Sequence, residues 1–319
     1  MSKDECFAVA CTLHFDAESF EAALQYLDEL NIIFYYPDIL PNTVFTDSQV
    51  LIAKASELVK FSHELRNEDA GSLLMARRGD CQKFQDYALV TVGFLKSFKE
   101  HYVDDIFTPD DLVKLFRALL VFADFSDTEY FMPCLLQIIS SEEVAKHRVS
   151  SSAATVPLIL HFPQGVPPLG IFCSLVVYLL SPSNHSPSPW KLVVDHSTTP
   201  VCFHRNCVQF TVPNQPGTIT LIDSFDFFEV HVSTQLCSLI IVREALLTGL
   251  KRVISNLGYS CKPELAFLCI CPRKGLHPAS IREDQSCWIC TLDSETFASI
   301  DERQQMWRPT SGKYLQGEL

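Results

Sequence analysis

Four short segments in the second half of the chain have the composition of β-strands and follow one another closely. They are WKLVV, VCFHRNCVQFTV, TITLID and FFEVHV, with Gly217 at one of the turns between them. A further strand pattern, VPLILHF, precedes them, and two apolar helix patterns, PLGIFCSLVVYLL and STQLCSLIIVREALLTGLKRVISNLG, accompany them. β-Branched and aromatic residues favour strands. Residues 151–262 are therefore predicted to form one α+β domain, an antiparallel meander sheet with packed helices.

The first half of the chain has a different, mostly helical pattern. In residues 1–66 a helix that Asp16 can cap is followed by the strand IIFYY, the hairpin ILPNTVF and a second helix. In residues 67–150 a helix from about 81 to 102 precedes TPDDLVKLFRALLVFADF, in which Thr108 is the expected N-cap, and then the strand EYFMPCLL. Both modules are predicted to be winged-helix-like. The polar, Ser-rich segment SSEEVAKHRVSSSAAT is predicted to be a linker.

The charge of the chain argues against two classes of partner. Residues 1–150 hold 13 Lys and Arg against 25 Asp and Glu, a net charge of −12, whereas the remaining residues hold 12 against 13. An acidic surface repels phosphate, so we expect no nucleic-acid partner and no anionic membrane surface. The longest apolar run, PLGIFCSLVVYLL, is too short to cross a bilayer.

The cysteine content points to a reducing compartment. The chain has 13 Cys, an odd number, and MSKDECFAVACTLHF lacks the uninterrupted apolar stretch of a signal peptide. We therefore expect free thiols and a cytoplasmic protein.

No motif of a nucleotide-dependent or hydrolytic enzyme occurs, since the chain lacks GxxxxGK[ST], GxGxxG, HExxH and GxSxG. The strand pattern VCFHRNC places Cys202 and His204 on one face, which leaves a cysteine hydrolase as an alternative. Burial as ordinary strand residues is the preferred interpretation of this cluster. In FDFFEVHV, Phe225, Phe227 and Glu229 face one way, and we expect one face to pack in the core and the other to meet a partner.

Residues 263–319 form a predicted Cys/His-rich tail. Its stretch CICPRKGLHPASIREDQSCWIC offers a structural zinc site made of Cys269, Cys271, His277 and Cys290, with Cys287 as a substitute ligand. The alternative is that ELAFLCIC is an apolar strand whose cysteines are core residues.

The order of the segments resembles the COR domain, the region C-terminal to the Roc GTPase in Roco-type proteins. Four segments carry the resemblance over about residues 10–260: AALQYLDELNIIFYYPDILPNTVFTDSQVLIAKASELV, DDLVKLFRALLVFAD with YFMPCLL, PLGIFCSLVVYLL, and CFHRNCVQF with TITLIDSFDFFEVHV. The resemblance implies an N-terminal half that packs beside a GTPase and a C-terminal half that mediates homodimerisation. It carries no catalytic or nucleotide-binding residue.

The resemblance implies a non-catalytic scaffold or dimerisation module that couples dimer state to a GTPase domain. The sequence contains no Roc domain, so that GTPase would lie elsewhere in a longer protein or act in trans. The alternatives are a zinc-stabilised interaction module that acts through the tail, and a cysteine-dependent hydrolase. No cofactor is expected apart from that zinc ion.

Overall fold

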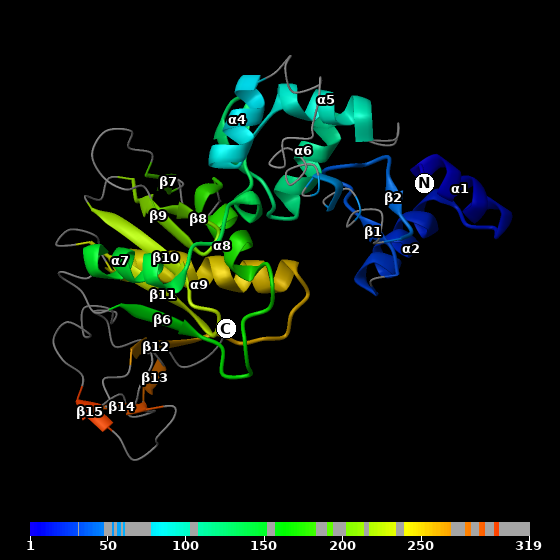
Figure 1. Ribbon diagram of the computed structural model, residues 1–319. Helices are drawn as coiled ribbons and strands as arrows, with labels where there is room; N and C mark the ends of the chain where they lie inside the picture. Colours follow the sequence, from blue (N-terminus) through cyan, green and yellow to red (C-terminus); the bar gives the residue numbers. More distant parts are fainter. Residues whose placement is uncertain are drawn as a thin grey trace. The chain divides into compact units, whose positions relative to one another are not determined.

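The computed structural model divides into two compact units, Met1–Phe131 and Met132–Leu319, and each is described by itself (Figure 1). The structure describes residues 1–30, 32–47, 53, 56–58, 60, 78–102, 108–151, 157–182, 190–193, 202–213, 217–233, 239–268, 278–281, 287–290 and 297–299. The α+β class predicted from the sequence is confirmed, with helices prominent in the N-terminal half and a many-stranded antiparallel sheet in the C-terminal half. Among the described residues no helix is both long and apolar enough to span a membrane.

The first unit opens with two helices and a hairpin. They are α1 (Lys3–Thr12), α2 (Ala17–Glu29), β1 (Phe34–Tyr35) and β2 (Val44–Phe45), with β1 and β2 paired antiparallel. Asp16 caps α2 as predicted, because its carboxylate accepts a hydrogen bond from the Ser19 amide at 2.8 Å. The prediction missed α1. The predicted second helix falls largely outside the described residues, although residues 53, 56–58 and 60 are helical.

From residue 78 onwards, the described part of the first unit combines helices with a small sheet of order β3-β5-β4. Its elements are α4 (Arg78–Tyr87), β3 (Leu89–Thr91), α5 (Val92–Tyr102), α6 (Pro109–Ala118), β4 (Ala123–Ser126) and β5 (Glu129–Phe131). The single helix predicted from about 81 to 102 is wrong, because Ala88 has a φ of 53° and ends α4. The Leu-Val-Thr sequence that follows then forms β3, in keeping with the strand preference of β-branched residues.

The helix α6 has the predicted start but ends sooner than predicted. Thr108 and Asp111 form a reciprocal capping box, and Pro109 occupies the first turn. Leu120, with a φ of 55°, ends the helical region, so Ala123, which lies in the predicted helix pattern, instead belongs to β4.

The second unit contains, within the described residues, a ten-stranded sheet of order β15-β14-β13-β12-β6-β11-β10-β9-β7, and β8 also pairs with β9. The strands are β6 (Leu158–His161), β7 (Lys191–Leu192), β8 (Phe203–His204), β9 (Cys207–Thr211), β10 (Thr218–Asp223), β11 (Phe227–Val232), β12 (Glu264–Leu268), β13 (Pro278–Ile281), β14 (Cys287–Cys290) and β15 (Phe297–Ser299). The predicted meander is present in β9, β10 and β11, but β6 inserts between β11 and β12. The strands of the predicted tail therefore extend this sheet.

Among the described residues of the second unit, helices lie on both faces of the sheet. They are α7 (Ser141–Ser151), α8 (Ile171–Leu180) and α9 (Leu239–Asn256), while the short η2 (Pro133–Leu135) contacts α8. The helices α8 and α9 pack against each other, and Phe172 of α8 contacts Phe228 of β11 at a ring distance of 5.4 Å. The opposite face of β11 carries Glu229, which Arg148 of α7 contacts.

The segment predicted to be a linker, residues 140–155, instead forms α7 over Ser141–Ser151. Its first turn is held by Ser140, whose hydroxyl accepts a hydrogen bond from the Glu143 amide at 3.3 Å. Val144 is buried beside Cys207 and Ile222 of the sheet. These contacts with distant strands explain why a polar sequence without apolar periodicity is helical here.

Candidate functional site

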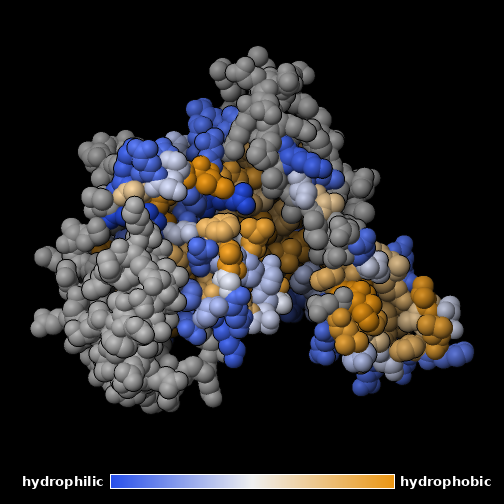
Figure 2. Space-filling view, turned by 60° about the horizontal axis from the view of Figure 1, so that its bottom comes forward, coloured by the Kyte–Doolittle hydropathy of each residue, from blue (hydrophilic) through white to orange (hydrophobic). Residues whose placement is uncertain are grey.

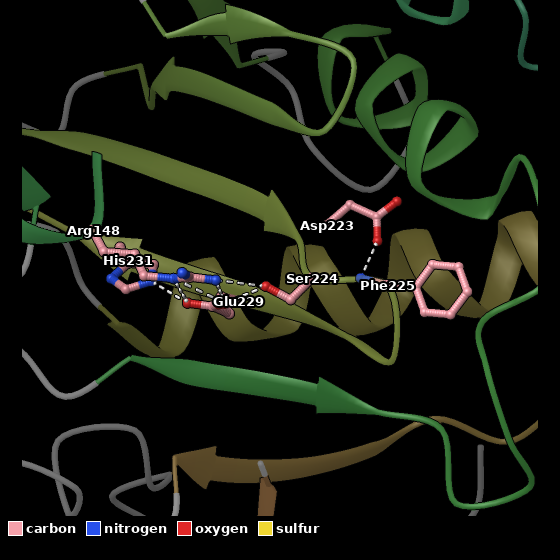
Figure 3. A network of polar contacts seen from close by, with 6 residues as sticks. All are labelled: Arg148, Asp223, Ser224, Phe225, Glu229 and His231. Carbon is pink, nitrogen blue, oxygen red and sulfur yellow. Dashed lines mark hydrogen bonds and ion pairs between the residues drawn. The ribbon is translucent and has the colours of Figure 1, made fainter. Parts of the chain in front are cut away.

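Several polar groups converge on the buried carboxylate of Glu229 in β11. It is fully buried, and Arg148, Ser224 and His231 converge on it (Figure 3). Arg148 Nε donates hydrogen bonds to Glu229 Oε2 at 2.8 Å and to Oε1 at 3.1 Å. His231 Nε2 lies 2.9 Å from Glu229 Oε2, and the Ser224 hydroxyl donates to Oε1.

Strand and helix periodicity explain why these side chains meet. Successive residues of a strand alternate between faces, so Glu229 and His231 lie on the same face of β11. On α7, Val144 and Arg148 are four residues apart and therefore lie on one side of the helix. Val144 packs on the sheet, and Arg148 reaches Glu229 from the same side of the helix.

The network keeps Glu229 ionised. Burial alone would raise the pKa of Glu229, but hydrogen bonds from His231, Arg148 and Ser224 outweigh it and lower the pKa to about 2. Because an ionised carboxylate can only accept hydrogen bonds, His231 donates from Nε2. The other ring nitrogen of His231, Nδ1, is buried and has no hydrogen-bond partner in the described part of the chain.

The turn between β10 and β11 lies directly beside this network. Phe225 has a φ of 71°, a left-handed conformation that is uncommon for an aromatic residue. Its amide donates a hydrogen bond to Asp223 Oδ1 at 3.0 Å, and its ring points away from the network (Figure 3). Burial raises the pKa of Asp223, against the opposing effects of the Phe225 amide and Arg205. The side chain of Phe225 is 71% exposed, so the turn holds a large apolar group in solvent.

Further exposed apolar side chains lie in the loop that follows β6. Phe227 pairs with His161, the last residue of β6, so this loop and the β10–β11 turn leave the same end of the sheet. Within the loop Leu169 is 90% exposed, and Val166 is also exposed. We call Phe225, Val166 and Leu169 the sheet-end residues. Aromatic and aliphatic groups of this kind are typical anchors of protein–protein contacts.

A second group of exposed apolar side chains covers α1, α2 and the residues next to them (Figure 2). The group includes Val9, Leu13, Phe15, Tyr26, Leu30 and Ile32. Contiguous apolar surface on a protein usually marks a contact with another molecule.

The cluster considered for cysteine catalysis folds differently from the single strand that was predicted. VCFHRNCVQFTV turns back on itself, and β8 pairs with β9 through His204 and Cys207. A hydrogen bond with Cys207 and burial raise the pKa of Cys202, which opposes formation of a nucleophilic thiolate. Asn206 exchanges two hydrogen bonds of 3.0 Å with the backbone of Ile139. These contacts favour the interpretation of the cluster as core residues.

The expectation that one face of FDFFEVHV meets a partner is wrong for β11. All six residues of β11 are buried, because α7 covers the face of Glu229 while α8 covers the face of Phe228. Only the turn before the strand exposes an aromatic side chain, that of Phe225.

Most of the predicted zinc site lies outside the described residues. Cys269, Cys271 and His277 are not described, and Cys287 and Cys290 are the two ends of β14. Among the described side chains, no group of three or more potential ligands could hold a metal ion. Zinc binding therefore stays a prediction. Native mass spectrometry of the full chain checks it, since the mass of one zinc ion should be retained and an ion-free protein would contradict it.

Sequence reasoning missed Arg148 and the role of Glu229, although two signals were present. Ser140 and Glu143 have the spacing of a capping box, which marks the start of a helix. Glu229 and His231 interrupt an otherwise apolar strand, and buried polar residues in a strand require partners.

Comparisons with known proteins assign the chain to no family. A scan against protein-family models and a search of curated proteins each returned no match to the chain.

Proposed function

We propose that this chain is a non-catalytic protein-interaction module whose second unit docks a partner through the sheet-end residues. The observation that carries the proposal is the turn at Phe225. An aromatic side chain is held in solvent by a residue with a left-handed φ, beside a network of buried charges. A conformation of this kind is unfavourable by itself, so it persists only where the surrounding structure determines it.

The partner that we propose is a second copy of the chain. The resemblance to the COR domain implies homodimerisation through the C-terminal half, and the segments that carry it there form α8, β8, β9, β10 and β11. Phe225, Val166 and Leu169 belong to that half and expose apolar surface. In a symmetric dimer the same surface is used by both copies, so these exposed apolar residues can serve both sides.

The first unit would then contact a GTPase domain, in cis or in trans. The same resemblance implies this role for the N-terminal half. The exposed apolar side chains over α1 and α2 support it, because they provide a surface that a partner could cover. The module would thereby couple its dimer state to a GTPase in the cytoplasm.

The experiment is sedimentation velocity of the full chain at tens of micromolar, with Phe225→Ser and Phe125→Ser compared with the unchanged protein. Phe125 is a suitable control because it is an exposed phenylalanine of the first unit. We expect a dimer that Phe225→Ser weakens by roughly tenfold or more and that Phe125→Ser leaves unchanged. A strictly monomeric unchanged protein would overturn homodimerisation, and equal effects of the two substitutions would overturn the role of the sheet-end residues.

A further inference from the structure

We propose that α7 is a latch that holds the β10–β11 turn in its docking conformation, and that Arg148 is its positioning residue. The proposal rests on the proposed function, because it concerns the turn that presents Phe225. It assigns the positioning of this turn to a helix that the sequence pattern alone predicts to be a linker.

The first observation is that burial of an apolar side chain is confined to one residue among the described side chains of α7. Of its side chains that the structure describes, Val144 alone is buried, while Glu142, Ala145 and Lys146 are exposed. Most of the stability of a helix in a protein comes from packing of an apolar face. The described side chains of α7 supply Val144 for this packing, beside a ring contact of His147 with His204 at 6.2 Å. The ion pair between Arg148 and Glu229 therefore contributes to holding the helix on the sheet.

The second observation is that one guanidinium group joins α7 to both the strand and the turn. Arg148 Nε donates to Glu229, and Arg148 Nη2 donates to the hydroxyl of Ser224 at 2.9 Å. Ser224 immediately precedes Phe225, and its amide donates a hydrogen bond to the Phe227 carbonyl at 3.0 Å across the turn. The position of the turn is thus tied to the position of α7.

The third observation concerns the two ends of α7. The chain just before its N-terminal end is anchored, since the Ile139 amide donates a hydrogen bond to the side chain of Asn206, and Ser140 caps the first turn of the helix itself. The part that contains Arg148 lies near the C-terminal end. Release of the latch therefore means that this end leaves the sheet while the N-terminal end stays attached. Removal of the guanidinium leaves a buried carboxylate with His231 and Ser224 alone, which is unfavourable.

The experiment is hydrogen exchange measured by mass spectrometry on the full chain, in four variants. Arg148→Met removes the guanidinium but keeps a long side chain, and Lys146→Met is the matched control on the exposed side of α7. Ser224→Ala cuts the connection to the turn and removes the hydroxyl that donates to Glu229, but keeps both charged groups of the ion pair. Arg148→Lys keeps a positive charge but cannot donate to Glu229 and Ser224 in the same planar geometry.

Arg148→Met should accelerate exchange at least tenfold both in residues 141–151 and in residues 222–228, with β9 unchanged. Ser224→Ala and Arg148→Lys should accelerate exchange in the turn much more than in α7. Lys146→Met should leave the exchange rates of both the turn and α7 unchanged. The proposal is overturned if Arg148→Met loosens α7 and leaves the turn as protected as before, or if Ser224→Ala has no effect on the turn. Should Arg148→Met not fold, Ser224→Ala and Arg148→Lys decide the question.

This readout does not depend on a dimer, so failure of the proposed function and failure of the latch can be told apart. A monomeric protein whose turn loosens in Ser224→Ala retains the latch and loses the proposed function. A dimer that Phe225→Ser disrupts, with turn exchange unchanged in Ser224→Ala, retains the proposed function and loses the latch.

Discussion

The helices α6 and α7 begin in the same manner but are held in the protein by different forces. At the start of α6 the Thr108 hydroxyl accepts a hydrogen bond from the Asp111 amide at 3.1 Å, and at the start of α7 Ser140 does the same for Glu143 at 3.3 Å. α6 then buries four apolar side chains, whereas Val144 is the one buried side chain described for α7.

This difference between α6 and α7 shows which kind of helix can be predicted from the sequence. The apolar stripe of α6 lies within ten residues, so the pattern shows where the helix packs. α7 packs through Arg148, whose partner Glu229 lies 81 residues further along the chain. An ionic contact of this range leaves no periodic pattern in the sequence of the helix itself.

The largest expected effect is the loss of the ion pair of α7. Arg148→Met should destabilise the second unit by roughly 3–5 kcal/mol, because it leaves the buried carboxylate of Glu229 without its cation. The double variant Arg148→Met with Glu229→Met should recover most of this loss, since both charges are then absent. Urea unfolding followed by tryptophan fluorescence measures the free energy of unfolding of the second unit, because all three tryptophans belong to residues 132–319. A double variant as unstable as Arg148→Met would show that the pair contributes more than charge compensation.

The corresponding change in α6 removes an apolar contact. Leu115 is completely buried, and Leu115→Ala should destabilise the first unit by about 3 kcal/mol. Hydrogen exchange in residues 109–118 measures the effect, with the exposed Lys114→Ala as the control. An effect below about 1 kcal/mol would mean that the apolar stripe does not hold α6 in place.

The two helices should also respond differently to acid. The pKa of Glu229 in the folded protein is about 2, below the ordinary value of 4.5, so its contribution is fully present above about pH 4.5 and is lost as the pH falls towards 2. The lost stability is on the order of 2–3 kcal/mol. Hydrogen exchange of α7 at pH 3 and pH 6, corrected for the intrinsic rates, should show this loss. Glu229→Gln should abolish the pH dependence, and a persistent dependence in that variant would assign it to other carboxyl groups.

The smallest expected effect comes from removing the hydroxyl groups that cap α6 and α7. Thr108→Ala and Ser140→Ala each remove a hydroxyl that accepts a backbone hydrogen bond, and each should destabilise its helix by about 1 kcal/mol. Local hydrogen exchange in α6 and α7 measures both. A much larger effect of Ser140→Ala would indicate that the cap, and not Arg148, is the main attachment of α7.

Several features of the fold were predictable because their causes are local. Asp16 and Thr108 cap helices as predicted, and the β10 and β11 strands follow the predicted segments TITLID and FFEVHV. The helix predicted over 81–102 failed because a left-handed Ala88 divides it, a conformation that propensity does not anticipate. The prediction that one face of FDFFEVHV meets a partner failed for another reason. Alternation assigned Phe225 and Glu229 to one face of the strand, but it does not show which elements cover that face.

By itself the sequence determined the α+β class, the caps of α2 and α6 and most of the strands, since propensity, capping and alternation act over a few residues. The tertiary structure decided that residues 141–151 are helical, that Glu229 is buried and that Phe225 is exposed. These outcomes depend on Arg148, Ser224 and His231, which meet only when α7 lies on the sheet. A buried charge is stable only beside its partners, and the folded chain alone brings those partners together.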